Sequence, residues 1–200
     1  LFCFGDMMRV PCGTASLSSL RADGADVRIC VSPMDALEFA REHPLREVVW
    51  FGVGFETTTP HTAALIEAGI RSGVKNLSIL CAHKTMPNAL RALLSGETRA
   101  DALLCPGHVA AITGADAFAF LPEEYGIPAA ISGFEPEDLL LAIFALLKMQ
   151  ASGTPKLVNA YSRVVNPAGN PAARSLVETY FEPCDALWRG LGEISSSGLS

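Results

Sequence analysis

The sequence predicts an α/β fold with two Rossmann-like lobes, each built on a parallel sheet, followed by an irregular C-terminal segment. Short runs rich in apolar and β-branched residues alternate with segments of helical periodicity, and this alternation is typical of βαβ units. The run at residues 47–53 is almost continuously apolar, as expected of a parallel strand that is covered on both faces. One six-stranded sheet is the alternative that these observations leave open.

Six strands are expected, in two sets of three that divide near residue 60. They are the runs at residues 1–4, 27–31, 47–53, 77–81, 102–105 and 128–132. Ser32 and Pro33 form a good start signal for the first clear helix, and Pro44 ends it. Helices are expected at residues 33–42, 60–72, 86–94, 117–125 and 135–150, with one more helical stretch after residue 107.

A short internal echo supports two related lobes. Gly54-Phe55-Glu56-Thr57 follows the third strand and Gly133-Phe134-Glu135-Pro136 follows the sixth, and each segment leads into a helix. The first lobe is therefore expected at residues 1–59 and the second at residues 60–152.

The C-terminal extension is expected at residues 153–200, after a linker rich in small residues. It should contain an edge strand at residues 159–165 and a helix at residues 171–181 that Asn170 leads in. The remainder, which includes Trp188-Arg189-Gly190-Leu191-Gly192, is expected to be irregular.

Composition excludes several classes of protein. Half of the 200 residues are apolar and the formal net charge is −6, with no basic run, which argues against a nucleic-acid-binding protein. The longest apolar stretch, residues 139–147, is about half the length needed to cross a bilayer, so no membrane association is expected. We expect this stretch to lie in a buried helix.

The six cysteines are scattered without a close pair. This spacing fits neither a disulfide scaffold nor a complete zinc or iron–sulfur site, and a cytoplasmic location is the simplest reading. The chain opens on Leu1-Phe2-Cys3-Phe4, without an initiator Met or a cleavage site. We therefore expect it to be a fragment.

The most specific candidate site is the segment Gly54-Phe55-Glu56-Thr57-Thr58-Thr59-Pro60. In parallel sheets ligands bind at the carboxyl ends of the strands, and this segment follows a strand directly. Its threonines offer hydroxyls and N–H groups at a helix N-terminus, which suits an anion. The alternative is that Thr58 or Thr59 caps the helix while Glu56 balances the helix dipole.

His83 and His108 each follow a strand and could face one cleft. Neither has a second histidine at helical spacing, which argues against a self-contained zinc site. The alternative for each is a histidine that is hydrogen-bonded to loop backbone. Arg163 and Arg174 could bind an anion or could lie on a solvated face.

Eight ordered motifs together resemble the HypD family of hydrogenase-maturation factors over residues 1–200. They are Gly5-Asp6-Met7-Met8-Arg9-Val10-Pro11, Ala25-Asp26-Val27-Arg28, Ser32-Pro33-Met34-Asp35-Ala36-Leu37, Gly54-Phe55-Glu56-Thr57-Thr58-Thr59-Pro60, Pro106-Gly107-His108-Val109, Gly133-Phe134-Glu135-Pro136, Tyr161-Ser162-Arg163-Val164-Val165 and Trp188-Arg189-Gly190-Leu191-Gly192.

The resemblance implies a metallocofactor-assembly scaffold with a redox role rather than a conventional enzyme. Members of this family join HypC-like proteins to hold an iron ion, on which cyanide and carbon monoxide ligands are assembled, and HypE-like proteins deliver the cyanide. The intact family member also carries a 4Fe-4S cluster. The family's Cys-Gly-x-His and Cys-x-x-Cys motifs are missing here, so this chain alone is expected to hold neither iron nor cluster.

Under this resemblance five residues are candidates for lining a cleft between the lobes or contacting a partner: Glu56, Thr57, His83, His108 and Glu135. Their role would be hydrogen bonding and proton management. One competing hypothesis is an α/β enzyme that acts on a small anionic or carbonyl substrate, with Glu56 and His108 as acid and base. Another is a pure docking module.

Overall fold

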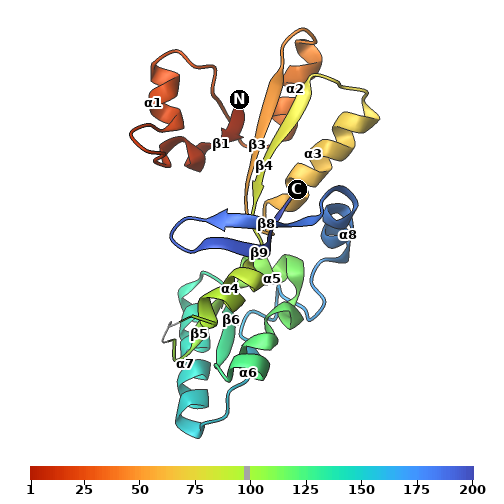
Figure 1. The fold of residues 1–200 in the computed structure, drawn as a ribbon. Coiled ribbons are helices and arrows are strands. Elements are labelled where there is room, and N and C mark those ends of the chain that lie inside the picture. The colour runs from red at the N-terminus through yellow and green to blue at the C-terminus, as the bar shows by residue number, and fades with distance from the viewer. Residues whose placement is uncertain (97–99) are drawn as a thin grey trace.

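The computed structural model describes residues 1–96 and 100–200. Two parallel sheets form the centres of two lobes, and a C-terminal extension lies across the junction between them (Figure 1). This architecture confirms the predicted α/β class with parallel sheets in two lobes, and it excludes one six-stranded sheet.

The first lobe contains a four-stranded parallel sheet in the order β2-β1-β3-β4. Trp50 and Leu65, both fully buried, lie at the centre of its core, where α2 and α3 pack on one face of the sheet. Its elements are β1 (Phe2–Phe4), η1 (Gly5–Arg9), α1 (Leu17–Ala22), β2 (Arg28–Cys30), α2 (Met34–Glu42), β3 (Val48–Gly54), α3 (Thr59–Arg71) and β4 (Leu77–His83).

The second lobe contains a three-stranded parallel sheet in the order β5-β6-β7. Ile131 points into a core formed with α5 and α6, whereas Ala130 packs against Ala142 and Met149 of α7 on the other face. Its elements are α4 (Met86–Leu94), β5 (Leu103–Pro106), α5 (Gly107–Thr113), η2 (Ala115–Phe118), α6 (Phe120–Tyr125), β6 (Ala129–Ser132), α7 (Pro136–Ser152) and β7 (Leu157–Asn159).

The strand predicted at residues 77–81 belongs to the first sheet, so its assignment to the second set of three strands is wrong. β4 pairs with β3 along its whole length, from Val48–Leu77 to Gly54–His83. The cause is that β3, α3 and β4 form one βαβ unit, in which consecutive strands usually lie side by side. The chain therefore passes to the second lobe only after β4, where Met86 and Leu90 of α4 pack on the second core.

The extension is regular, contrary to the prediction of an irregular remainder. It consists of α8 (Pro171–Tyr180), β8 (Pro183–Trp188) and β9 (Gly192–Leu199), and the two strands form an antiparallel hairpin. Gly190 and Gly192 have φ of +84° and +81° at the turn, a conformation that glycine adopts without strain. The helix prediction is confirmed, and the Asn170 side chain accepts a hydrogen bond from the Ala173 N–H. The edge strand of the second sheet is β7, which lies slightly before the predicted position.

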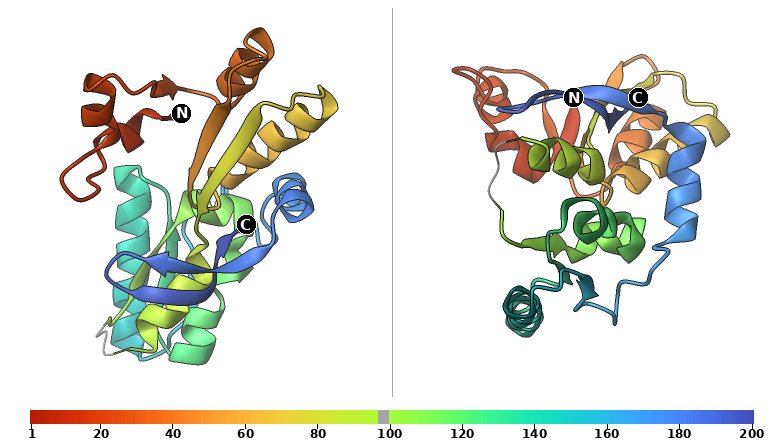
Figure 2. Two further views of the ribbon diagram at one scale, coloured as in Figure 1. Left: turned by 45° about the horizontal axis from the view of Figure 1, so that its top comes forward. Right: turned by 60° about the horizontal axis from the view of Figure 1, so that its bottom comes forward.

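The extension contacts both lobes. α8 packs against α3 of the first lobe and α5 of the second, while β9 contacts β4 and α4. Figure 2 shows the hairpin and α8 across the junction from two further directions. The extension therefore joins the lobes rather than trailing from the second one.

The apolar stretch at residues 139–147 is not buried, contrary to expectation. Only one stripe of α7 faces the sheet, through Asp138, Ala142, Leu146 and Met149, because a helix that packs on one side of a sheet buries one face. Large side chains on the opposite face are solvent-exposed: Leu140, Leu141, Ile143, Phe144 and Leu147. Within the described residues, every helix is too short or too polar to span a bilayer.

The packing of the extension on the second lobe is expected to depend on Gly114. Gly114 and Gly24 have nearly equal φ, +94° and +100°, but a Cβ at Gly114 would overlap the Pro167 carbonyl oxygen whereas one at Gly24 meets open space. Gly114→Ala should therefore lower the free energy of unfolding by about 2 kcal/mol more than Gly24→Ala, as measured by urea denaturation. Equal losses in the two variants would show that this backbone contact is not needed.

Candidate functional site

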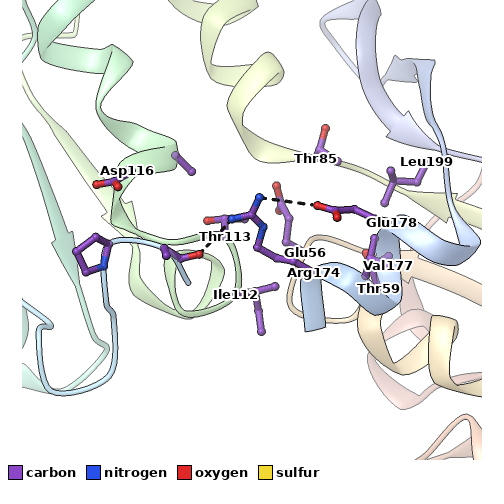
Figure 3. Close-up of a pocket in the computed structure, with 13 residues that line it drawn as sticks. Glu56, Thr59, Thr85, Ile112, Thr113, Asp116, Arg174, Val177, Glu178 and Leu199 are labelled. Atoms are coloured by element: carbon purple, nitrogen blue, oxygen red, sulfur yellow. Dashed lines mark hydrogen bonds and ion pairs between the residues drawn. The ribbon is translucent and has the colours of Figure 1, made fainter. Parts of the chain in front are cut away.

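A cavity of about 540 Å³ lies at the junction of the two lobes and the extension (Figure 3). The first lobe supplies Glu56 and Thr59, and Thr85 comes from the segment between β4 and α4. The remaining lining residues are Ile112, Thr113, Asp116 and Ala117 from the second lobe and Pro167, Ala168, Arg174, Val177, Glu178 and Leu199 from the chain after β7. Most of the wall is apolar, so the few polar groups determine what the cavity can bind.

The turn before α3 is held by its own threonines. The Thr58 hydroxyl donates to the carbonyls of Val53 and Phe55, and the Thr59 hydroxyl donates to Phe55. Thr58 occupies the N-cap position of α3, in agreement with the alternative of a capping threonine, but its side chain accepts no N–H at the start of the helix. Gly54 has φ of +125°, and a Cβ there would overlap the Thr58 hydroxyl, which makes glycine necessary at this position.

Glu56 links the two lobes. Its Oε1 accepts a 2.8 Å hydrogen bond from the Met86 N–H at the start of α4. Its Oε2 is buried and finds no hydrogen-bond partner among the described residues. Burial raises the pKa of this carboxyl above its ordinary value, while the Met86 N–H opposes the rise. Glu56 is therefore a carboxyl group that is biased toward holding its proton.

Among the described residues that line the cavity, Arg174 is the one with a cationic side chain. Its Nη1 donates to the Ala168 carbonyl at 3.2 Å, and its Nη2 lies 3.8 Å from Glu178 Oε1. Both side chains are partly exposed, so this ion pair is weak and Arg174 keeps donors for a ligand. The cavity thus combines apolar walls, a carboxyl whose pKa is raised by burial and a cation.

His83 lies in the core of the first lobe rather than in the cavity. It is 1% exposed, and its Nε2 lies 2.9 Å from the Thr62 hydroxyl, which in turn accepts a hydrogen bond from the Trp50 indole. Its ring also packs edge-on against Phe181. Burial lowers the pKa of His83 to about 4, an effect that the neighbouring Gly54 carbonyl only partly offsets. The neutral ring is a structural group that joins β4 to α3.

His108 and Glu135 lie at the carboxyl edge of the second sheet, outside the lining of the cavity that contains Glu56. The exposed His108 ring packs edge-on against Phe134, with centroids 4.7 Å apart. Glu135 lines a separate hollow of about 470 Å³ together with Arg163 and Asp138, which form a bidentate ion pair. These two candidates therefore share one edge of the second lobe, apart from Glu56.

Of the five predicted site residues, Glu56 alone lines the cavity, and Thr57 lies beside it in the same turn, half-buried. Sequence reasoning missed Thr85, Thr113, Asp116 and Glu178. No local pattern marks them, because they come from segments that are far apart in the chain and meet only after the lobes and the extension have packed together.

The described residues do not fit an iron or iron–sulfur site. Among residues 1–96 and 100–200, no three His, Cys, Asp or Glu side chains gather as a possible metal site. Burial raises the pKa of Cys30 to about 11 and that of Cys105 to about 12, which favours the protonated thiol at both positions.

The depressed pKa of His83 predicts a pH dependence of stability. The folded state resists protonation down to about pH 4, whereas an unfolded histidine titrates near 6.5, so the stabilising effect is complete above pH 6.5 and is lost as the pH falls toward 4. The loss between pH 7 and pH 4.5 should be about 2 kcal/mol. Urea denaturation at the two pH values checks it.

In that experiment His83→Gln should remove this part of the pH dependence. The matched control is His61→Gln, which changes an exposed histidine on α3 and should leave the dependence unchanged. If the two variants keep the same pH slope as the parent chain, then His83 is not the group responsible.

Comparison with known proteins places the chain in one family. The HypD model, described as the hydrogenase formation hypA family, matches residues 1–200. The chain is 46% identical to the hydrogenase maturation factor HypD of Rhodobacter capsulatus and 45% identical to that of Escherichia coli, in each case over all of this chain and 54% of the relative. It is 43% identical to HypD of Azotobacter vinelandii over 98% of this chain and 54% of the relative.

The chain thus spans about half the length of the curated relatives that it matches. The match of the family model over the whole length confirms the resemblance carried by the eight motifs. This chain belongs to the HypD family of hydrogenase-formation proteins.

Proposed function

We propose that the chain acts in hydrogenase maturation as the central part of a scaffold, and that the cavity around Glu56 handles a small iron-bound ligand group as cargo. The names of the relatives, hydrogenase maturation factors, support the broad role. The finer role is the assembly of cyanide and carbon monoxide ligands on iron, together with HypC-like and HypE-like partners in the cytoplasm.

The observation that carries this proposal is the environment of Glu56. A carboxyl whose Oε2 is buried, with no hydrogen-bond partner in residues 1–96 and 100–200, lies in the wall of a largely apolar cavity, to which both lobes and the extension contribute. An apolar wall excludes water, which strengthens every remaining electrostatic interaction. In its protonated form Glu56 can donate a hydrogen bond to an anionic ligand such as cyanide, whereas the ionised form would repel it.

The iron itself would be held by other residues. Soft thiolates suit iron that carries strong-field ligands, and the described residues supply no such ligand set. In this proposal the iron-holding cysteine and the 4Fe-4S cluster belong to other parts of a full-length family member, and the present residues contribute hydrogen bonding and proton management.

The competing acid–base enzyme needs His108 beside Glu56. His108 is exposed against Phe134 and is not among the residues that line the cavity, so the geometry gives this alternative no support. A scaffold that uses the cavity needs the Glu56 carboxyl for hydrogenase maturation, whereas a pure docking module does not. The following variant separates the two roles.

Glu56→Gln should lower hydrogenase maturation by about tenfold or more, because the amide keeps hydrogen-bond donors and an acceptor but removes proton transfer at this position. Glutamine can still accept the Met86 N–H bond but can neither hold nor release a proton. The measurement is hydrogenase activity in a strain that lacks its own HypD and expresses the full-length protein containing these residues. Copurification of the HypC-like partner should be unchanged.

The matched control is Glu67→Gln, which removes a carboxylate on the outer side of α3 that pairs with Arg71. It should mature hydrogenase like the parent protein. Full maturation with Glu56→Gln would contradict the scaffold chemistry proposed for the cavity and would favour a docking module.

A further inference from the structure

The hairpin formed by β8 and β9 holds the first turn of α4. The Thr85 N–H donates to the Ser197 carbonyl at 2.9 Å, and the Asn88 side chain donates to the Ser196 carbonyl at 2.8 Å. Lys84 pairs with Gly198 in an isolated antiparallel bridge. The bonds of Thr85 and Asn88 therefore flank Met86, whose N–H donates to Glu56.

Ser196 presents its carbonyl through an unusual backbone conformation. With φ of +50° it is the one non-glycine residue in the described part of the chain that has positive φ. Asp185 on the facing strand stabilises this conformation, because its Oδ1 accepts bonds from the Ser196 N–H at 2.9 Å and from the Ser195 hydroxyl at 2.8 Å. A left-handed residue costs free energy, so its presence at this contact indicates a geometric requirement.

Trp188 connects the same hairpin to the turn that carries Glu56. Its indole N–H donates to the Ser197 hydroxyl at 2.7 Å, and its ring packs against Phe55 with centroids 5.8 Å apart. Ser197 is fully buried, and its hydroxyl donates a hydrogen bond to the Ile194 carbonyl. The hairpin therefore contacts Phe55, the residue before Glu56, and Thr85, the residue before Met86.

We propose that the β8–β9 hairpin is a clamp that positions Glu56 in the cavity, with Asp185 and Trp188 as its positioning residues. Asp185 acts through Ser196 and the first turn of α4, and Trp188 acts through Phe55. The contacts stand independently of the biological role, while the effect on maturation rests on the function proposed above.

The Met86 amide proton reports on the clamp directly. In the parent chain its NMR shift should change as Glu56 titrates, and Glu56→Gln should abolish that change. Asp185→Ala should diminish the shift change and should lower the hydrogen-exchange protection of the Met86 amide by about tenfold, the equivalent of one hydrogen bond.

The matched control is Asp35→Ala. Asp35 Oδ2 likewise accepts two backbone N–H bonds, from Val31 and Ser32, at an exposed turn of the first lobe. The Asp35→Ala variant should leave the titration shift and the hydrogen-exchange protection of the Met86 amide unchanged. This result would distinguish the clamp from a general loss of stability. Unchanged protection and titration of Met86 in a folded Asp185→Ala protein would overturn the proposal.

Trp188 is tested with two variants, so that a failure to fold does not decide the matter. Trp188→Phe keeps a ring beside Phe55 but loses the bond to Ser197, and Trp188→Ala loses both. Met86 protection should fall in both variants and should fall further in Trp188→Ala. Equal, parent-like protection in the two folded variants would remove Trp188 from the clamp.

In the full-length protein, Asp185→Ala should reduce hydrogenase maturation, and combining it with Glu56→Gln should add nothing, because both changes act on one group. Additive losses would contradict positioning through Glu56. If Glu56→Gln leaves maturation unaffected while Asp185→Ala still loosens Met86, the proposed function fails and the clamp stands.

Discussion

The hydrogen bond between the Glu56 carboxyl and the Met86 amide is the interaction on which the architecture of the site depends. Glu56 follows the third strand of the first sheet, whereas Met86 begins a helix whose apolar face packs on the core of the second lobe. The bond therefore fixes one lobe relative to the other at the wall of the cavity. The second carboxyl oxygen is buried and has no hydrogen-bond partner in the described part of the chain, and this burial raises the pKa of Glu56.

The extension stabilises this arrangement because it contacts both lobes at their junction. α8 lies between α3 and α5, and the hairpin lies against β4 and α4. Gly114 and Gly169 approach each other's backbone closely, and this contact packs the loop at residues 167–169 against the second lobe. A cavity that needs three separate segments for its wall forms only when the extension has docked, so folding of the extension and formation of the site are coupled.

Local patterns in the sequence were sufficient to predict the alternation of strands and helices, the Asn170 cap and the position of the turn that carries Glu56. They did not reveal which sheet takes the strand at residues 77–83, because its apolar pattern fits either neighbour. The exposure of Leu140 and Phe144 could not be predicted from the sequence either, since their burial depends on what packs against each face of α7. The cavity residues Asp116 and Glu178 carry no local signal at all, because their proximity arises from tertiary packing.

The internal echo shows how similar segments diverge in use. Gly54 adopts positive φ and sends Glu56 across to another helix, whereas Gly133 is confined by Asp138 and Tyr161, and Glu135 stays beside its own helix. At equivalent positions of two strand–helix junctions, the Glu56 carboxyl thus bonds to the other lobe, whereas the Glu135 carboxyl stays at the edge of its own sheet. The edge formed by His108, Phe134 and Glu135 is a second polar surface of the molecule, separate from the cavity.

The central claim is that Glu56 is a partly buried carboxyl whose pKa is raised by burial and whose Oε1 is anchored to the Met86 N–H. A carbon-detected NMR titration of the Glu56 side-chain carboxyl measures its pKa directly. The account predicts a pKa above the ordinary value of 4.5, with the Met86 amide proton shifting at the same midpoint. A pKa at or below 4.5, with no matching change at Met86, would contradict it.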